Sequence, residues 1–494
     1  MKRLYAALGL SRAPPARVTR WTETAARAWM PLLLFFGAAL YLPILDARPL
    51  RFEEGRRAVQ ALEIYFGGSW WYLEVLGEPY VNKPPLLPWL IALVGSFRGG
   101  IDEVAVRLPA VLSVLLGAVT AGALARLLLP ERGAIAALCA GVAFYSCAFV
   151  MTKARLGETD TLVTAFCGLA VLIWVRARLK GEVGWLAWAG VSLCLAAAAF
   201  TKGPIPLLFP ALPLLALPLL QRRWREALAA LAALLASLLP LGWWAYDNLA
   251  ATDAAHWTQE MRVAGRDLPP GYWLSLLHLN QVPVGIAYTL PWFLPALWVI
   301  VAARCDWLRQ SWPVLALALY ALPVSLFVLI WGEARPRYAM PAVWPLVVLA
   351  GLWVARYWLR SLVPALLLLG GIITPVIFQI VTLGFVEGKT DYQRAFLARA
   401  EALSSATAPL PPGPLLLLDS AGEPDFDSLA YAGRPLTRLP VAALACPSQG
   451  RFLLVTEYDR ASLADLPVWR LEAEIAGGWM ALYARDESVC PLGR

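Results

Sequence analysis

Two adjacent carboxylates, Glu53 and Glu54, occur in a short polar segment between apolar stretches of the chain. Arg56 follows two residues after the pair, and Lys83 lies thirty residues beyond Glu53. Charged side chains beside a bilayer are costly unless they carry out chemistry or line water. Carboxylates and fixed cations at a lipid headgroup are what the transfer of a charged, lipid-borne group requires. We therefore take these four residues as candidate site residues.

The acidic pair also has a purely structural explanation. Carboxylates in the first turn of a helix interact favourably with the helix dipole, and Arg56 and Arg57 stand at i+3 and i+4 from Glu53 for local ion pairing. The double proline that follows Lys83 favours a functional role, because it fixes the direction of the chain directly after the lysine.

Further polar side chains lie at the ends of later apolar runs. They are Glu158, Asp160, Lys202, Arg335, Arg337 and Tyr338. The structural explanation for this set is an interfacial group of ion pairs with long side chains that snorkel to the membrane surface. The functional explanation is a second group of phosphate- and sugar-binding residues. Only two histidines occur and no cysteines have zinc-site spacing, so we expect no metal and no cofactor.

The composition predicts that these residues are positioned by membrane-spanning helices. Of 494 residues, 60% are hydrophobic and 15% charged, whereas soluble domains carry about 25% charged residues. The mean hydropathy is +0.61. The chain is therefore expected to be a polytopic α-helical membrane protein. Its net charge of +8 indicates topology and contact with anionic lipids, not nucleic acid.

The apolar runs predict about 11 spans, and up to 13 if ambiguous segments also cross. The predicted spans are 29–45, 105–128, 133–151, 157–176, 184–200, 203–220, 227–246, 282–302, 312–331, 338–356 and 361–386. The run 85–97 is short for a crossing and begins with the double proline. It is expected to be a helix along the outer surface.

If 85–97 does not cross, the basic loops between spans fall on the same side as the basic segment 1–28, as the positive-inside rule requires. This parity predicts a cytoplasmic N-terminus and a transmembrane domain over 29–386. Within that domain it predicts a first outer loop at 46–104 and a second at 247–281. Both sets of candidate residues then lie on the outer side.

The first outer loop carries a second helical pattern over 53–66, in which Val59, Leu62 and Phe66 recur at i, i+3 and i+7 and form an apolar face. This segment is expected to lie flat at the membrane interface, with Trp70, Trp71 and Tyr72 as interfacial anchors.

The composition changes after about residue 387, and 387–494 is expected to be a small extracytoplasmic α/β domain. Its predicted elements are a helix at Asp391–Ser404 and strands at Leu415–Leu418, Phe452–Thr456, Val468–Ile475 and Trp479–Ala484. Cys446 and Cys490 in this domain are candidates for a disulfide.

The motifs, taken in order over about residues 30–390, resemble glycosyltransferase family 39, which holds protein O-mannosyltransferases and the bacterial lipid A aminoarabinose transferase. The motifs are Glu53-Glu54 with Arg56, Lys83-Pro84, Asp160, Thr201-Lys202-Gly203-Pro204, Pro291-Trp292, and Arg335-Pro336-Arg337-Tyr338 with Pro341 and Pro345. The chain departs from the family at Glu53, where an Asp is usual. The choice of catalytic residue between Glu53 and Glu54 is therefore open.

The resemblance implies the GT-C fold and the transfer of a sugar, with inversion, from a polyprenyl-phosphate-linked donor to lipid A, lipopolysaccharide or protein. The implied location is the bacterial inner membrane, with the site facing the periplasm. The resemblance and the charges together suggest three roles. Catalytic candidates are Glu53, Glu54 and Asp160; donor-phosphate-binding candidates are Arg56, Lys83, Lys202 and Arg337; substrate-binding candidates are Glu158, Arg335 and Tyr338. A transporter or lipid flippase is the main alternative, and a scaffold in envelope assembly is another.

Overall fold

The computed structural model describes residues 16–51, 53–251, 281–303, 311–330, 336–358, 362–386, 391–411, 413–418, 425–445, 447, 450–463, 466–486 and 488–489. The chain forms two compact units. Unit 1 consists of Met1–Pro43 and Ala110–Ile380, and unit 2 of Ile44–Pro109 and Val381–Arg494. Two helices belong partly to each unit, α5 (Glu103–Leu128) and α18 (Leu362–Val386).

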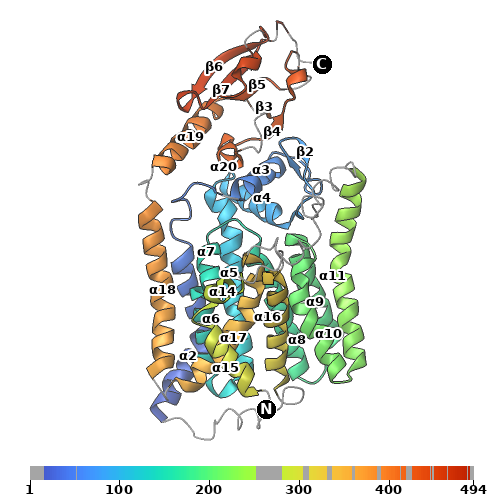
Figure 1. The fold of residues 1–494 in the computed structure, drawn as a ribbon, viewed down its shortest axis with the longest axis vertical. Helices are drawn as coiled ribbons and strands as arrows, with labels where there is room; N and C mark the ends of the chain where they lie inside the picture. The colour runs from blue at the N-terminus through green and yellow to red at the C-terminus, as the bar shows by residue number, and fades with distance from the viewer. Residues whose placement is uncertain are drawn as a thin grey trace, which may run out of the picture. The chain divides into compact units, whose positions relative to one another are not determined.

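Unit 1 is helical in its described parts (Figure 1). Its helices are α2 (Ala16–Tyr41), α6 (Gly133–Ser146), α7 (Ala148–Lys153), α8 (Asp160–Leu179), α9 (Trp185–Lys202), α10 (Leu208–Leu220), α11 (Trp224–Ala251), α14 (Gln281–Thr289), α15 (Phe293–Ala303), α16 (Trp312–Ile330) and α17 (Val343–Tyr357). Short 3₁₀ turns are η1 (Pro130–Arg132), η2 (Ile205–Leu207) and η4 (Pro336–Ala342).

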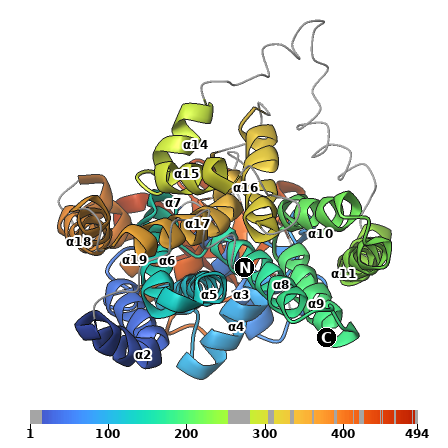
Figure 2. The same ribbon diagram turned by 90° about the horizontal axis from the view of Figure 1, so that it is seen from below.

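Small residues allow the helices of unit 1 to approach closely. Figure 2, which looks along the helices, shows α6 between α2 and α17. A Cβ on Gly351 of α17 would lie 2.7 Å from the backbone nitrogen of Ala140 of α6. On the side of α8, Gly168 packs against the Trp344 ring, whose Nε1 donates to Thr120 Oγ1 at 3.0 Å. Such close contacts drive helix association where lipid removes the hydrophobic effect between helices.

Among the described residues, six helices are long and apolar enough to cross a membrane. They are Glu103–Leu128, Asp160–Leu179, Trp185–Lys202, Trp224–Asn248, Pro336–Tyr357 and Leu362–Thr382. The number rises to seven if the bent helix pair within 282–303 counts as one span. The described residues also include four shorter apolar helices, Ala28–Tyr41, Leu86–Arg98, Ile205–Leu220 and Trp312–Leu326. The multi-pass membrane class is confirmed, while the count of about 11 spans stays a prediction.

Two expected spans differ in shape from a single helix. The run 282–302 is bent by 98° between α14 and α15. The bend lies at Pro291, whose nitrogen carries no hydrogen for a helical hydrogen bond. The run 133–151 is divided at Cys147, which has an extended backbone between α6 and α7.

Unit 2 combines the first outer loop with the C-terminal part of the chain. Its helices are α3 (Glu54–Tyr65), α4 (Leu86–Arg98), α19 (Asp391–Thr407) and α20 (Phe426–Leu429), and a short hairpin joins β1 (Glu74–Val75) to β2 (Glu78–Pro79). Short 3₁₀ turns are η5 (Ala430–Ala432), η6 (Val441–Ala443), η7 (Arg460–Leu463) and η8 (Ala476–Gly478). The predicted helices over 53–66, 85–97 and Asp391–Ser404 are confirmed. Phe66, expected on the apolar face of the first, is 52% exposed at its end.

A five-stranded sheet completes unit 2, in the order β4-β3-β5-β7-β6. Its strands are β3 (Leu415–Leu418), β4 (Leu436–Arg438), β5 (Phe452–Thr456), β6 (Trp469–Ile475) and β7 (Met480–Arg485). β3 pairs in parallel with β4 and β5, whereas β7 pairs antiparallel with β5 and β6. The small C-terminal α/β domain is therefore confirmed. The sequence missed β4, which is only three residues long.

Candidate active site

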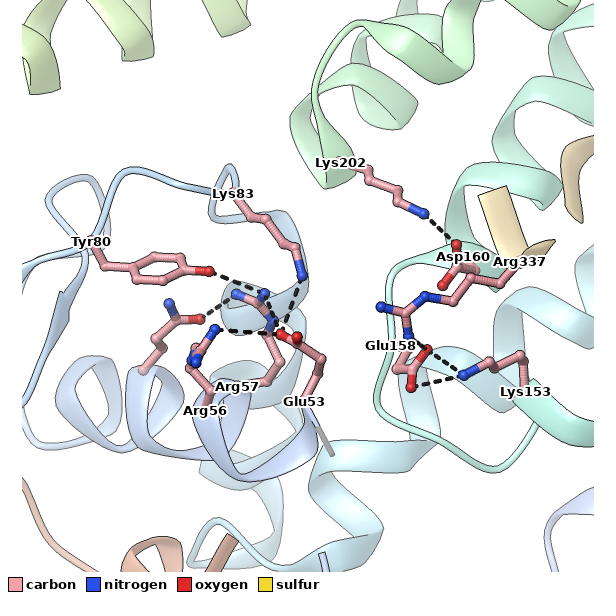
Figure 3. Close-up of polar contacts among 11 residues, drawn as sticks. Glu53, Arg56, Arg57, Tyr80, Lys83, Lys153, Glu158, Asp160, Lys202 and Arg337 are labelled. Atoms are coloured by element: carbon pink, nitrogen blue, oxygen red, sulfur yellow. Dashed lines mark hydrogen bonds and ion pairs between the residues drawn. The ribbon is translucent and has the colours of Figure 1, made fainter. Parts of the chain in front are cut away.

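Charged side chains of unit 2 gather around the start of α3, and we call Glu53, Arg56, Arg57 and Lys83 the Glu53 cluster. One carboxylate oxygen, Glu53 Oε2, lies 3.2 Å from Lys83 Nζ, 3.4 Å from Arg57 Nη2 and 3.8 Å from Arg56 Nη1. Figure 3 shows Lys83 reaching this oxygen from the loop before α4, whereas both arginines come from α3 itself. Three cations thus share one carboxylate.

Local structure explains why these groups meet. Glu53 is the N-cap residue of α3, but its side chain makes no capping hydrogen bond. Its carboxylate is therefore directed to the cations. Arg57 is buried and donates to Gln60 Oε1 at 2.9 Å and to Tyr80 OH at 3.3 Å, so the guanidinium is fixed.

The Glu53 cluster remains partly open to solvent. The side chains of Glu53, Arg56 and Lys83 are 25%, 23% and 28% exposed. Burial raises the pKa of the Glu53 carboxyl, but the charges of Lys83, Arg57 and Arg56 outweigh this effect and lower the pKa to about 2. Glu53 is therefore ionised at any physiological pH and is a weak base.

Glu54 has a different environment, although it is the next residue. Its side chain is fully buried, and both carboxylate oxygens accept from Arg107 of α5, at 2.8 and 2.9 Å. Arg107 also donates to the backbone oxygens of Leu45, Arg48 and Pro49. Glu54 thus connects the start of α3, through Arg107, to α5 and to the segment 45–49 that precedes α3.

A second group of charges lies in unit 1, and we call Lys153, Glu158, Asp160, Lys202 and Arg337 the Asp160 cluster. Glu158 Oε2 lies 2.8 Å from Lys153 Nζ and 2.9 Å from Arg337 Nη1, while Asp160 forms an ion pair with Lys202 (Figure 3).

Helix ends position the Asp160 cluster. Asp160 is the first residue of α8 and Lys202 the last residue of α9, and these two helices pack together. Arg337 and Tyr338 belong to η4, which contacts α8. The Lys202 ammonium lies 4.4 Å from the centre of the Tyr338 ring, a cation–π distance.

Most predicted site residues therefore fall in one of the two clusters. Glu53, Arg56 and Lys83 meet in the first, and Asp160, Glu158, Lys202 and Arg337 meet in the second. Tyr338 lies beside the second cluster, with its ring against Lys202. Glu54 faces Arg107 instead. Arg335 lies outside the described residues, as do Cys446 and Cys490 and most of the loop 247–281.

Sequence reasoning gave no site role to Arg57, Tyr80, Lys153 or Arg107. The i+4 spacing of Arg57 to Glu53 was interpreted only as local ion pairing, and Lys153 could have been found from its place before Glu158. Arg107 carries no such signal, because it stands in an apolar run 53 positions from its partner Glu54.

Each cluster carries more positive than negative charge. The Glu53 cluster has three cations and one carboxylate, and the Asp160 cluster has three cations and two carboxylates. An excess of fixed, partly open cations suits an anion such as a phosphate, to which Arg offers a planar fork and Lys a point charge. Among the described residues, no three His, Cys, Asp or Glu side chains are grouped to hold a metal ion.

The chain is similar in sequence to known glycosyltransferases. The sequence profile of the family described as dolichyl-phosphate-mannose-protein mannosyltransferase matches residues 82–246. The undecaprenyl phosphate-α-4-amino-4-deoxy-L-arabinose arabinosyl transferase of Pseudomonas aeruginosa (strain UCBPP-PA14) is 31% identical over 347 residues, which are 66% of this chain and 59% of the relative. The match thus spans less than two thirds of that relative's length.

Solved structures extend the likeness to the fold. The crystal structure of ArnT from Cupriavidus metallidurans bound to undecaprenyl phosphate matches 94% of this chain and 99% of its own, with a TM-score of 0.68 and 18% identity. The apo oligosaccharyltransferase of Archaeoglobus fulgidus matches 94% of this chain and 75% of its own, with a TM-score of 0.54 and 11% identity.

The fold is that of the GT-C glycosyltransferases. The resemblance to glycosyltransferase family 39 that the motifs indicated is confirmed.

Proposed function

We propose that this chain is an integral-membrane glycosyltransferase that moves a sugar from a polyprenyl-phosphate-linked donor to an acceptor of the bacterial envelope. One observation carries the proposal: Lys83, Arg56 and Arg57 converge on the accessible carboxylate of Glu53. The GT-C fold and the family match support it. The donor sugar named for the relatives, 4-amino-4-deoxy-L-arabinose, is the first candidate. Lipid A, which the resemblance to family 39 implied, is the first acceptor to test, before other lipopolysaccharide or protein.

We propose the cations of each cluster separately as candidates for binding the donor phosphate. Lys83 and Arg56 are partly exposed in the Glu53 cluster, and Lys202 and Arg337 are the corresponding groups of the Asp160 cluster. Breaking the bond between C1 of the sugar and the phosphate oxygen develops negative charge on the phosphate. Fixed cations stabilise that charge without reorganisation. Asp160 orients Lys202, while Glu158 and Tyr338 are the candidates for the sugar.

Of the acidic pair, we propose Glu53 as the functional carboxylate and Glu54 as a structural one. Glu54 is buried with both oxygens bound by Arg107. Glu53 is open to solvent, but a pKa of about 2 makes it a poor general base. We therefore infer that Glu53 orients the cations instead of removing a proton.

Because Glu53 is a poor base, we infer an acceptor whose attacking atom does not need to lose a proton. A phosphate of lipid A is already ionised, so its oxygen attacks C1 directly. The new bond forms between that oxygen and C1, and the old C1–O bond breaks with its electron pair on the departing polyprenyl phosphate. No proton moves, and attack from the opposite face inverts C1.

The proposed location is the inner membrane, with both clusters on the periplasmic side. The basic loops between predicted spans support this orientation through the positive-inside rule.

A transporter or flippase is less well supported. Such proteins hold polar groups near the midplane, commonly on discontinuous helices. The bent pair α14–α15 carries no charged residue, and Asp160 and Lys202 stand at helix ends.

The test is mass spectrometry of lipid A from a deletion strain and from the same strain complemented with the wild-type chain. The proposal predicts that a mass increment of one amino sugar on lipid A is absent after deletion and returns on complementation. An unchanged lipid A, together with an unchanged set of envelope glycoconjugates, would contradict it.

A further inference from the structure

The first turn of α3 is not capped by the side chain of its own N-cap residue. A helix N-terminus leaves backbone N–H groups without intrahelical partners, and the side chain at the N-cap commonly accepts from the N–H at N2 or N3. In α3 the N-cap is Glu53, whose side chain accepts from neither. Another group must therefore serve the first turn if Glu53 is to face Lys83.

That group comes from the C-terminal part of unit 2. Asp427 Oδ1, on α20, accepts from the backbone N–H of Gly55 at 3.0 Å. Gly55 stands at N2 of α3, the position that a capping side chain normally serves. Asp427 thus caps α3 from a segment that lies 372 positions away in the chain.

Gly55 permits this contact because it has no side chain. A Cβ at this position would lie 2.4 Å from the carbonyl oxygen of Phe426, and 2.5 Å from both the nitrogen and the Cα of Asp427. Backbone atoms at these distances cannot yield as the end of a flexible side chain can.

The same short helix also holds Arg56. The Arg56 guanidinium lies 4.9 Å from the centre of the Phe426 ring, within cation–π range. The same guanidinium places Nη1 3.8 Å from Glu53 Oε2.

α20 is itself anchored at both ends. At its start, Asp425 accepts from the backbone N–H of Ser428 at 3.3 Å and from the Ser428 hydroxyl at 2.6 Å. Beyond its end, Tyr431 donates to Glu103 Oε1 at 2.6 Å and accepts from the backbone N–H of Leu50 at 2.9 Å. The segment 425–431 is therefore a fixed support and not a loose neighbour.

From these contacts we propose that Asp427 and Phe426 are positioning residues for the reaction: Asp427 caps α3 in place of Glu53 and so releases the Glu53 carboxylate to Lys83, while Phe426 holds Arg56. The C-terminal α/β domain is then part of the catalytic apparatus through α20. This inference rests on the proposed function for its kinetic consequence, but the ion pair between Glu53 and Lys83 does not depend on it.

The consequence of losing Asp427 follows from the geometry. Without that carboxylate the Gly55 N–H needs a new acceptor, and Glu53, the N-cap residue two positions before Gly55, carries the nearest carboxylate in the sequence that is not bound by Arg107. Glu53 then turns away from Lys83, and the ion pair between these two residues is lost.

The experiment compares Asp427→Ala with Asp427→Asn in the full-length protein in lipid nanodiscs. Two readouts are used. One is kcat with undecaprenyl phosphate-α-4-amino-4-deoxy-L-arabinose and lipid A. The other is the rate at which an amine-acylating reagent labels Lys83, followed by mass spectrometry. Glu474→Ala, which removes a half-exposed carboxylate from β6 of the same domain, is the matched control.

We expect Asp427→Ala to lower kcat by on the order of 10-fold to 100-fold, because small misplacements of site groups cost that much. Lys83 labelling should become faster, as it should in Glu53→Gln. Asp427→Asn keeps the accepting oxygen and should restore both readouts, and Glu474→Ala should change neither. Should Asp427→Ala prove unstable, Phe426→Leu tests the second contact, with a lower kcat expected and recovery in Phe426→Tyr.

Wild-type kcat and labelling in Asp427→Ala would overturn the inference. So would equal impairment of the Ala and Asn variants with unchanged Lys83 labelling, since that result indicates a structural role only. Failure of the proposed function looks different: neither the wild type nor any variant transfers sugar, while the labelling comparison still reports on the cap.

Discussion

At the scale of single residues, Glu53 and Glu54 show how two neighbouring carboxylates can take separate tasks. Successive residues of a helix point about 100° apart. Glu54 is directed inward to Arg107, whereas Glu53 is directed to Lys83 and stays partly exposed. The sequence could name the pair as a site but not choose between its members, because the choice depends on Arg107.

Glu54→Gln is expected to destabilise the protein with little direct effect on the Glu53 cluster. The substitution leaves the Arg107 guanidinium buried without its compensating charge, and such a loss costs about 3 kcal/mol or more. The measurement is the unfolding temperature of the purified variant, with the exposed Glu78→Gln as control. A wild-type unfolding temperature in Glu54→Gln would show that the buried pair contributes nothing.

At the scale of elements, local sequence predicted what local physics determines. The spacing of Val59 and Leu62 predicted α3, because a helix that buries one face repeats its apolar residues at that period. The all-leucine run predicted β3, because a strand that is buried on both faces is apolar throughout. The bend at Pro291 and the short strand β4 were missed. The apolar pattern of the sequence continues through the bend at Pro291, and β4 has too few residues to show a period.

The candidate site was partly predictable for the same reason. Residues that stand close in sequence, such as Glu53 and Arg56, could be paired by spacing. Contacts such as Arg107 with Glu54 or Asp427 with Gly55 join distant segments and appear only in the folded chain.

The packing of α3 against its neighbours also predicts a pH effect on stability. Burial, followed by the nearby Glu74, raises the pKa of the Glu63 carboxyl to about 7, although a backbone hydrogen bond from Leu436 opposes the shift. The unfolded value is about 4.3. Between these values the folded state binds more protons than the unfolded state, so stability falls as pH rises through this window.

Glu63→Gln should therefore raise the unfolding temperature at pH 8.5 and have a smaller effect at pH 5, because Gln cannot ionise and still accepts a hydrogen bond. Thermal unfolding at both pH values checks this, with the exposed Glu78→Gln as control. A gain that is equal at both pH values, or a loss at pH 8.5, would exclude titration of Glu63 as the cause.

At the scale of the whole molecule, both clusters must lie on the periplasmic side of the membrane if both bind parts of the substrates there. Each cluster lies within one of the two compact units. The positions of the basic loops in the sequence predict that both clusters face the periplasm.

Topology reporters fused at residue 83 and at residue 337 test this requirement. Both fusions should report the periplasm, and a fusion within the basic segment 221–225 should report the cytoplasm. Reporters that place residues 83 and 337 on opposite sides would exclude one of the two clusters from the periplasm.

We propose that the cations gathered on Glu53 stabilise the departing polyprenyl phosphate during sugar transfer. This proposal is tested most directly by adding undecaprenyl phosphate-α-4-amino-4-deoxy-L-arabinose and lipid A to the purified protein in nanodiscs and following modified lipid A by mass spectrometry. We expect transfer by the wild type and by the exposed-lysine control Lys180→Ala, and loss of transfer by on the order of 100-fold or more in Glu53→Gln and Lys83→Ala. Near-normal transfer by either of the last two variants would contradict the account.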